Sequence, residues 1–200
     1  MLTRMTELTI DCGDILLREY RMEDVDAICA LTQEPAILEF LPDWNASKEQ
    51  RLDWMANYEL VENKQFLQAV AEDGHIGDLC LRLGIVLKET GAFIGWCVTG
   101  MKDELPSPNR EIAYAISQDY SGKGYMTQAA RALITYLFEN TDVTELNAVA
   151  RLNNISSNKV IQKCGFIQYS EIDIDKQPHL YYKLRKSEWT GKQKCEGMNV

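Results

Sequence analysis

The spacing of apolar and polar residues divides the chain into an alternating series of strands and helices. Residues 13–20 alternate apolar and polar side chains as a strand does, and residues 23–33 follow with helical spacing. Residues 47–63 open with Ser47 and place Gln50 three positions later, an arrangement that caps the start of a helix. The first part of the chain is therefore expected to form one strand and two helices.

The rest of the pattern predicts mainly strands. Residues 79–88 and 92–100 are apolar runs separated by a short turn that contains glycine, so they are expected to form a hairpin. The elements expected beyond it are strand 110–117, helix 124–138, strand 144–152, helix 154–165, strand 166–174 and strand 179–189. The strand–helix–strand order implies parallel pairing beside antiparallel hairpins, which is an α/β fold with one mixed central sheet.

Composition narrows the class of protein. The 200 residues are 46% hydrophobic and 26% charged, which is the balance of a soluble globular protein. A formal net charge of -9 argues against binding nucleic acid through its phosphates. No apolar run is long enough for a membrane span or a secretory leader. We expect one domain over residues 1–189, with a tail over 190–200 that is too polar to pack.

The cysteines and histidines favour no metal chemistry. The six cysteines never occur as Cys-x-x-Cys, and the chain has only two histidines. Zinc sites need clustered ligands of these types, so we expect no metal site. Most of the cysteines lie in apolar segments, which is typical of reduced thiols in the core of a cytoplasmic protein.

One short stretch carries chemistry beyond packing. Gly122, Lys123 and Gly124 stand where the helix over 124–138 is expected to begin. The first N–H groups of a helix have no partner within it and carry partial positive charge, so a glycine turn there favours an anion, and Lys123 adds a cationic contact. Glycine as simple turn punctuation is the alternative. The dinucleotide fingerprint fails because Thr127 stands where its third glycine would be, and the P-loop pattern is absent.

Three linked motifs resemble a known family. The segments EIAYAIS (111–117), GKGYMTQAARAL (122–133) and NISSNKVIQKCGF (154–166) resemble, in order and spacing, the GNAT N-acetyltransferases of the ribosomal-protein-alanine acetyltransferase (RimJ/RimL) type. The resemblance is strong over 110–167, moderate over 13–109 and absent in the tail. It implies a mixed, largely antiparallel sheet, flanked by helices and splayed open in its middle, with acetyl-coenzyme A held in the gap.

The resemblance also implies which residues bind acetyl-coenzyme A. Main-chain N–H groups at the glycine turn would bind the diphosphate, those of the preceding strand would face the reacting carbonyl, and an asparagine would bind the pantetheine arm while capping its helix. These residues are Ala115, Ile116, Ser117, Gly122, Lys123, Gly124, Tyr125, Met126, Thr127 and Asn154. Ser121 and Met126 depart from the family's phosphate-loop pattern, and the bulk of Met126 predicts crowding near the phosphates.

The implied reaction is attack of an amine on the thioester. A lysine-like amine with a pKa of about 10.4 is almost fully protonated at pH 7, which costs about 4.6 kcal/mol, whereas an α-amine with a pKa of about 7.7 costs about 1 kcal/mol. Glu111 is the candidate base, directly or through water, with a pKa raised by burial beside Tyr114. The alternative is a solvated carboxylate paired with Arg110. Ser157 is the candidate that protonates or orients the leaving thiolate, and simple helix capping is its alternative.

The acceptor site is predicted less sharply. Phe40 and Trp44 are expected to wall it, and the acids expected to attract a cation are Glu39, Asp43, Asp173 and Asp175. A core role for Trp44 and a solvated rim of acids are the alternatives. The acceptor is expected to be a primary amine, with a peptide or protein N-terminus ahead of an antibiotic or polyamine. A catalytically silent acyl-coenzyme A-binding domain remains open, and the sequence does not predict the oligomeric state.

Overall fold

Helices and strands follow one another much as the apolar spacing predicts. The computed structural model describes residues 7–190. Its strands and helices are, in chain order, β1 (Thr9–Cys12), β2 (Ile15–Glu19), α1 (Val25–Thr32), α2 (Pro35–Leu38), α3 (Lys48–Trp54), α4 (Leu60–Glu72), β3 (Leu81–Leu87), β4 (Phe93–Met101), β5 (Arg110–Ile116), α5 (Tyr125–Asn140), β6 (Glu145–Arg151), α6 (Ile155–Lys163), β7 (Ile167–Ile174) and β8 (Gln177–Arg185). The predicted hairpin is confirmed, because β3 and β4 pair antiparallel.

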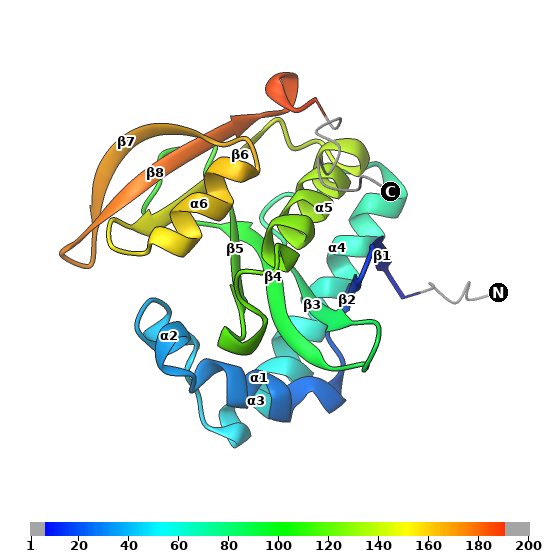
Figure 1. Cartoon of the computed structure of the whole chain (residues 1–200). Helices are drawn as coiled ribbons and strands as arrows, with labels where there is room; N and C mark the ends of the chain where they lie inside the picture. The colour runs from blue at the N-terminus through cyan, green and yellow to red at the C-terminus, as the bar shows by residue number, and fades with distance from the viewer. Residues whose placement is uncertain (1–6, 191–200) are drawn as a thin grey trace, which may run out of the picture.

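The eight strands form one sheet in the order β1-β2-β3-β4-β5-β6-β8-β7 (Figure 1). Neighbouring strands are antiparallel except β5 and β6, which run parallel. The parallel pair has a single registered contact, between Glu111 and Asn147. Beyond that contact the two strands diverge, so the middle of the sheet is splayed open. The predicted α/β class, with a mixed and largely antiparallel sheet, is confirmed.

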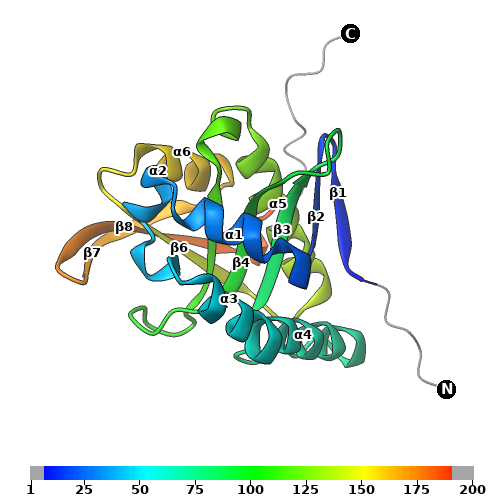
Figure 2. The same ribbon diagram turned by 90° about the horizontal axis from the view of Figure 1, so that it is seen from below.

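Helices cover both faces of this sheet (Figures 1 and 2). On one face α5 and α6 pack on the even-numbered side chains of β5, and Ile112 and Leu133 belong to that core. On the other face α1 and α2 contribute to a second core that contains Trp96 and Ala115. Side chains alternate between the faces of a strand, so each residue of β5 and β6 is assigned to one core or the other by its number. The residue number therefore tells on which side of the gap each of these side chains lies.

Three boundaries differ from the prediction. The strand expected over 13–20 is the second arm of a hairpin, which turns at Gly13 with a φ of +80°. The helix expected over 47–63 continues to Glu72, because a π-helical turn over Met55–Glu59 shifts the apolar stripe and Phe66 then becomes buried. The last strand ends at Arg185 and passes into a short 3₁₀ turn.

Some expectations fall partly outside the structure. From residue 191 onward, the expected tail lies outside the described residues. Within residues 7–190 no cluster of three or more histidine, cysteine, aspartate or glutamate side chains is arranged to hold a metal ion. No helix in that range has the length and apolar character needed to cross a bilayer.

Candidate active site

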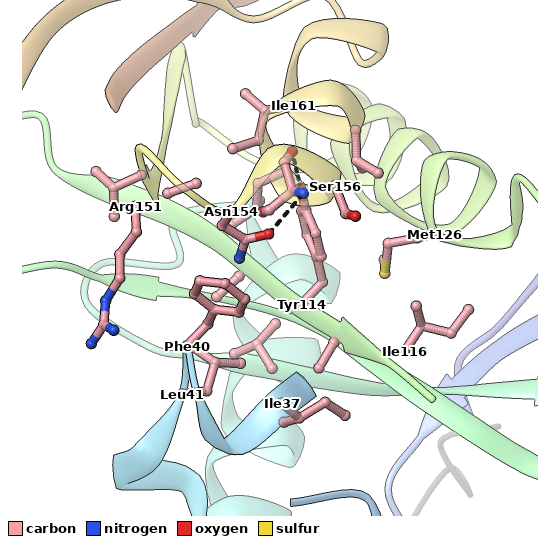
Figure 3. Close-up of a pocket in the computed structure, with 18 of the residues that line it drawn as sticks. Ile37, Phe40, Leu41, Tyr114, Ile116, Met126, Arg151, Asn154, Ser156 and Ile161 are labelled. Carbon is pink, nitrogen blue, oxygen red and sulfur yellow. Dashed lines mark hydrogen bonds between the residues drawn. The ribbon is translucent and has the colours of Figure 1, made fainter. Parts of the chain in front are cut away.

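The splay between β5 and β6 opens into a cleft of about 680 Å³. Its walls come from β5, β6, the start of α6, the loop before α5 and the segment around α2 (Figure 3). Segments far apart in the sequence therefore meet in one place. Figure 3 shows Asn154 and Ser156 at the start of α6, with Phe40 and Leu41 across the cleft from them.

The glycine turn before α5 borders this cleft. Gly122 and Gly124 have φ angles of +77° and +85°, a region that side chains of L-residues avoid. A Cβ atom built on Gly122 would meet nothing within 4 Å, and one on Gly124 would meet only the Gln128 amide at 3.9 Å. Protein packing therefore does not demand glycine at either position. The positive φ of the backbone does.

The first amides of α5 have no acceptor within residues 7–190. The helical ladder begins with the Gln128 N–H, which donates to the Gly124 carbonyl at 3.1 Å. The N–H groups of Tyr125, Met126 and Thr127 precede the ladder, and no acceptor for them occurs among the described residues. All three residues line the cleft. Free amides with partial positive charge fit the diphosphate of a coenzyme.

Met126 does not close the cleft. Its side chain is 6% exposed and belongs to the core beneath α5, while the cleft beside it stays open. Most of the bulk of Met126 is therefore directed into the core, and its effect on the phosphates stays a prediction. Lys123 does not line the cleft, and its ammonium lies 5.1 Å from the centre of the Tyr120 ring. Lys159 and Lys163, one helical turn apart on α6, do line the cleft; their i, i+4 spacing was a signal that the sequence offered.

The amide groups of β5 correct one prediction. The Ser117 N–H donates to the Ile94 carbonyl at 2.8 Å, so it cannot serve as a donor in the cleft. Ala115 lies two residues before Ser117 on the same strand, so its N–H also faces β4 in the antiparallel ladder. Of the three amides predicted, only that of Ile116 faces the gap. The amide of Tyr114 has the same direction, although the sequence did not predict a role for it.

The start of α6 brings Asn154 and Ser157 together with Tyr114. The Asn154 side chain accepts from the Ser157 N–H at 3.1 Å and so caps the helix, as predicted. The Ser157 hydroxyl donates to the Tyr114 oxygen at 3.2 Å, and the Tyr114 hydroxyl donates to the Ser157 carbonyl at 3.1 Å. Burial raises the pKa of Tyr114 far above its usual value. The pair is therefore two hydrogen-bonded neutral hydroxyls on the face of β5 that packs on α5 and α6.

Replacing Asn154 separates its two predicted roles. Asn154→Asp keeps the oxygen that caps α6 and removes the amide donor, so we expect an almost unchanged unfolding free energy and a KM for acetyl-coenzyme A raised about 10-fold, which is about 1.4 kcal/mol. Asn154→Ala removes both groups and should also lose about 1 kcal/mol of stability. Urea unfolding and steady-state kinetics measure the two effects. An unchanged KM in both variants would leave capping as the only role.

Glu111 lies at the closed end of the gap, on the face of β5 that carries Ala115. Burial raises the pKa of Glu111 to about 7, while the positive charge of Lys102 and a hydrogen bond from the Val149 N–H oppose that rise. The nearby Glu104 adds to it. A partly buried carboxylate that titrates near neutrality is suited to accept a proton.

Two expectations about the surroundings of Glu111 are wrong. Tyr114 lies three residues along the strand, so it points to the opposite face and does not bury the carboxylate. Arg110 is not its partner either, because the Arg110 guanidinium donates to the carbonyls of Gly77 and Leu79. The period of two along a strand was enough to exclude Tyr114.

Asn147 closes the sheet beside Glu111. Its side chain is fully buried, donates to the carbonyls of Pro108 at 2.9 Å and Arg110 at 3.0 Å, and accepts from the Tyr181 hydroxyl at 2.8 Å. These bonds fix the point at which β5 and β6 part. No local sequence pattern predicts this role.

Several of the residues predicted for the acceptor site lie together at the cleft, and their role in binding an acceptor stays a prediction. Phe40 and Trp44 line the cleft, and Asp43 and Asp175 line it as well, whereas Glu39 and Asp173 do not. Trp44 also packs on the buried Trp96, with ring centroids 5.2 Å apart, so it lines the cleft and belongs to the core at the same time.

A buried ion pair supports this wall from behind. The Arg51 guanidinium donates to the Trp44 carbonyl at 2.7 Å and to the Glu59 carboxylate at 3.0 Å. The π-helical turn places Glu59 there, and burial raises its pKa despite the neighbouring Arg51 and Arg82. The position of Trp44 is therefore tied to the core and not left to the loop.

Comparisons with known proteins agree with this geometry. A family model described as "Acetyltransferase (GNAT) domain" matches residues 14–167. Among curated proteins, "Putative ribosomal N-acetyltransferase YdaF" of Bacillus subtilis (strain 168) is 34% identical over 89 residues, which cover 42% of this chain and 49% of YdaF. The match therefore spans about half the length of that relative.

Solved structures share the fold. RimL, a ribosomal L7/L12 alpha-N-protein acetyltransferase in complex with coenzyme A, gives a TM-score of 0.70 at 16% identity, covering 89% of this chain and 98% of RimL. The acetyltransferase AAC(6')-Ib in complex with ribostamycin and coenzyme A gives 0.69 at 17% identity, covering 92% and 99%. Because the family model spans most of the sequence, the chain belongs to the GNAT family of acetyl-coenzyme A-dependent N-acetyltransferases.

Proposed function

We propose that the protein transfers the acetyl group of acetyl-coenzyme A to the N-terminal amine of a peptide or protein. One observation carries the proposal: a carboxylate with a pKa of about 7, Glu111, stands at the closed end of a cleft whose other end presents the free amides of α5. A carboxylate of this pKa can accept the proton of an attacking amine, and the amides of α5 can bind a diphosphate.

The residues of the cleft divide the chemistry between them. Glu111 takes the proton of the amine, directly or through one water, as the nitrogen attacks the thioester carbon and the new N–C bond forms. The amides of Tyr114 and Ile116 both face the gap, and we assign stabilisation of the developing oxyanion to that of Tyr114, which is only three residues along β5 from Glu111. The C–S bond then breaks, Ser157 orients the leaving thiolate by hydrogen bonding, and the thiolate takes up a proton from solvent. None of these steps requires a metal ion.

The charges on the acceptor side favour an N-terminus over a polycation. Lys102 and Arg151 line the cleft among the carboxylates of Asp43, Glu111 and Asp175, so an antibiotic with several ammonium groups would meet positive charge there. An α-amine also costs about 3.6 kcal/mol less to deprotonate at pH 7 than a lysine-like amine. RimL, named for acetylation of a protein α-amine, and YdaF support this candidate.

A panel of amines tests the acceptor class. At pH 7 we expect kcat/KM for short peptides with a free N-terminus to exceed that for spermidine or ribostamycin at least 10-fold, since the peptide amine is more often neutral and meets balanced charge. Release of coenzyme A thiol measures each rate, and a reaction without amine gives the hydrolysis background. If ribostamycin were the best substrate, the acceptor assignment would be wrong.

Acetylation of a small amine is the second candidate, favoured by the likeness of the fold to AAC(6')-Ib. A catalytically silent domain is distinguished by binding without turnover. Acetyl-coenzyme A at about 100 times its Kd stabilises a protein that binds it by about 2.7 kcal/mol. A rise in Tm that corresponds to this stabilisation, without release of thiol in the presence of any amine, would favour the silent domain. A cytoplasmic location stays a prediction from the sequence.

A further inference from the structure

Arg151 ends β6 at the open mouth of the cleft. Its odd number places it on the face of the sheet that carries Glu111 and Val149, on the acceptor side. Figure 3 shows its guanidinium extending past Phe40, away from the start of α6. The side chain is partly buried and lines the cleft. No prediction from the sequence had given it a role.

The charge of Arg151 is not neutralised within the described part of the chain. Its guanidinium donates to the Glu39 carbonyl at 3.1 Å, and no described carboxylate lies within 4.0 Å of it. By contrast, Arg18 makes two hydrogen bonds to the Asp24 carboxylate at 2.7 Å each, and Arg51 pairs with Glu59. A guanidinium is a fork of donors that suits a carboxylate, and one neutral carbonyl leaves most of that capacity unused.

The distance from the base limits where an acceptor carboxylate would stand. Glu111 is in register with Asn147, and Arg151 lies four residues further along β6. At about 3.3 Å per residue the two positions are roughly 13 Å apart along the strand, and the Arg151 side chain shortens that span. An extended peptide with its amine near Glu111 therefore brings its second or third side chain to Arg151.

We propose that Arg151 selects acceptors that carry a carboxylate at this distance from the amine, namely peptide N-termini with aspartate or glutamate at the second or third position. The inference rests on the proposed function. The same chemistry in a small molecule is an amine and a carboxylate joined by a chain of methylenes, as in 6-aminohexanoate. An α-amino acid holds its two groups too close together to span from Glu111 to Arg151.

Bracing is the competing role for Arg151. Its bond to the Glu39 carbonyl ties β6 to the end of α2, and loss of that tie would disturb the acceptor wall for every substrate alike. A carboxylate-binding role affects acidic acceptors alone. The ratio of rates for acidic and neutral peptides therefore separates the two roles, whatever happens to the absolute rates.

The test uses three peptides of equal length that begin Ser-Glu, Ser-Gln and Ser-Lys and are otherwise identical, with a second set that varies the third position, and 6-aminohexanoate as a small acceptor. For the wild-type protein we expect kcat/KM to be about 10-fold higher for Glu than for Gln peptides, which corresponds to about 1.4 kcal/mol. Arg151→Met should abolish that ratio, Arg151→Lys should keep part of it, and Arg151→Glu should reverse it in favour of Lys peptides. Arg185→Met, at an exposed site away from the cleft, is the control and should leave the ratio unchanged.

The outcomes separate this proposal from the proposed function. Equal rates for all peptides in the wild-type protein, or a uniform loss in Arg151→Met, overturn the selection of carboxylates and leave peptide acetylation standing. Acetylation of 6-aminohexanoate alone would support binding of a carboxylate by Arg151, and it would show that the acceptor is a small molecule. No acetylation of any of these amines overturns both proposals.

Discussion

Replacing Gly124 with valine is expected to weaken binding of acetyl-coenzyme A by about 100-fold or more, equivalent to about 2.7 kcal/mol. Gly124 has a φ of +85° and borders the free amides of Tyr125, Met126 and Thr127. A branched side chain there would occupy the side from which a diphosphate approaches and would push the backbone out of the left-handed region. Isothermal titration of the variant with acetyl-coenzyme A measures the loss.

Gly91 provides the matched control for this substitution. It has a φ of +71° in the turn between β3 and β4, and a Cβ atom there would meet nothing within 4 Å. Gly91→Val therefore carries the same backbone strain, of order 1–3 kcal/mol, without facing the cleft. It should lose stability and retain affinity. Equal affinities of the Gly124 and Gly91 variants would contradict the binding role of the glycine turn.

Replacing Glu111 with glutamine is expected to lower kcat/KM by about 100- to 1,000-fold and to remove an ionisation from its pH profile. The wild-type rate should rise with pH through about 7, because burial raises the pKa of Glu111 to that value and the base acts when deprotonated. Initial rates between pH 5.5 and 9 measure both effects. An unchanged rate and profile would show that Glu111 is not the base.

Neighbouring charges make this prediction sharper. Lys102 lowers the pKa of Glu111 and Glu104 raises it, so Lys102→Gln should move the midpoint of the profile to higher pH and Glu104→Gln should move it to lower pH. Lys102 and Glu104 form an ion pair of 3.1 Å, and removing both should largely cancel the two shifts. If neither single substitution moved the midpoint of the pH profile, the titrating group would be one other than Glu111.

Stability gives a second measurement on Glu111. Its pKa is higher in the folded state than the ordinary value of 4.5, so the folded state holds the proton more tightly than the unfolded state. Its contribution to stability is present at low pH and is lost as the pH rises through about 7. Glu111→Gln should therefore be more stable than the wild-type protein above pH 7, although it is less active.

Local signals in the sequence predicted part of this site well. The glycine turn, the start of α5 and the cap at Asn154 depend on residues within a few positions of one another, and the structure has all three. The splay was predicted through the family resemblance alone, because no local pattern distinguishes a strand that pairs at one residue from one that pairs throughout. The opposite directions of Glu111 and Tyr114 followed from strand alternation and were overlooked.

Other features depend on contacts between distant segments. The direction of the Ser117 amide is set by the register of β5 on β4, and the bond from Arg151 to the Glu39 carbonyl joins residues that are 112 positions apart. The π-helical turn that carries Glu59 towards Arg51 interrupts the ordinary helical period. None of these has a signature within a window of ten or twenty residues.

The single rung between Glu111 and Asn147 has a mechanical consequence. Every strand before α5 lies on one side of that rung and every strand after it on the other, so the chain crosses between the two blocks once. We expect a change in the width of the mouth to pivot near Asn147, with each block keeping its own ladder and the bonds across the gap, such as Arg151 to the Glu39 carbonyl, giving way. We therefore expect distances near Glu111 to change least, and the far end of the cleft to change most, when acceptors of different size bind.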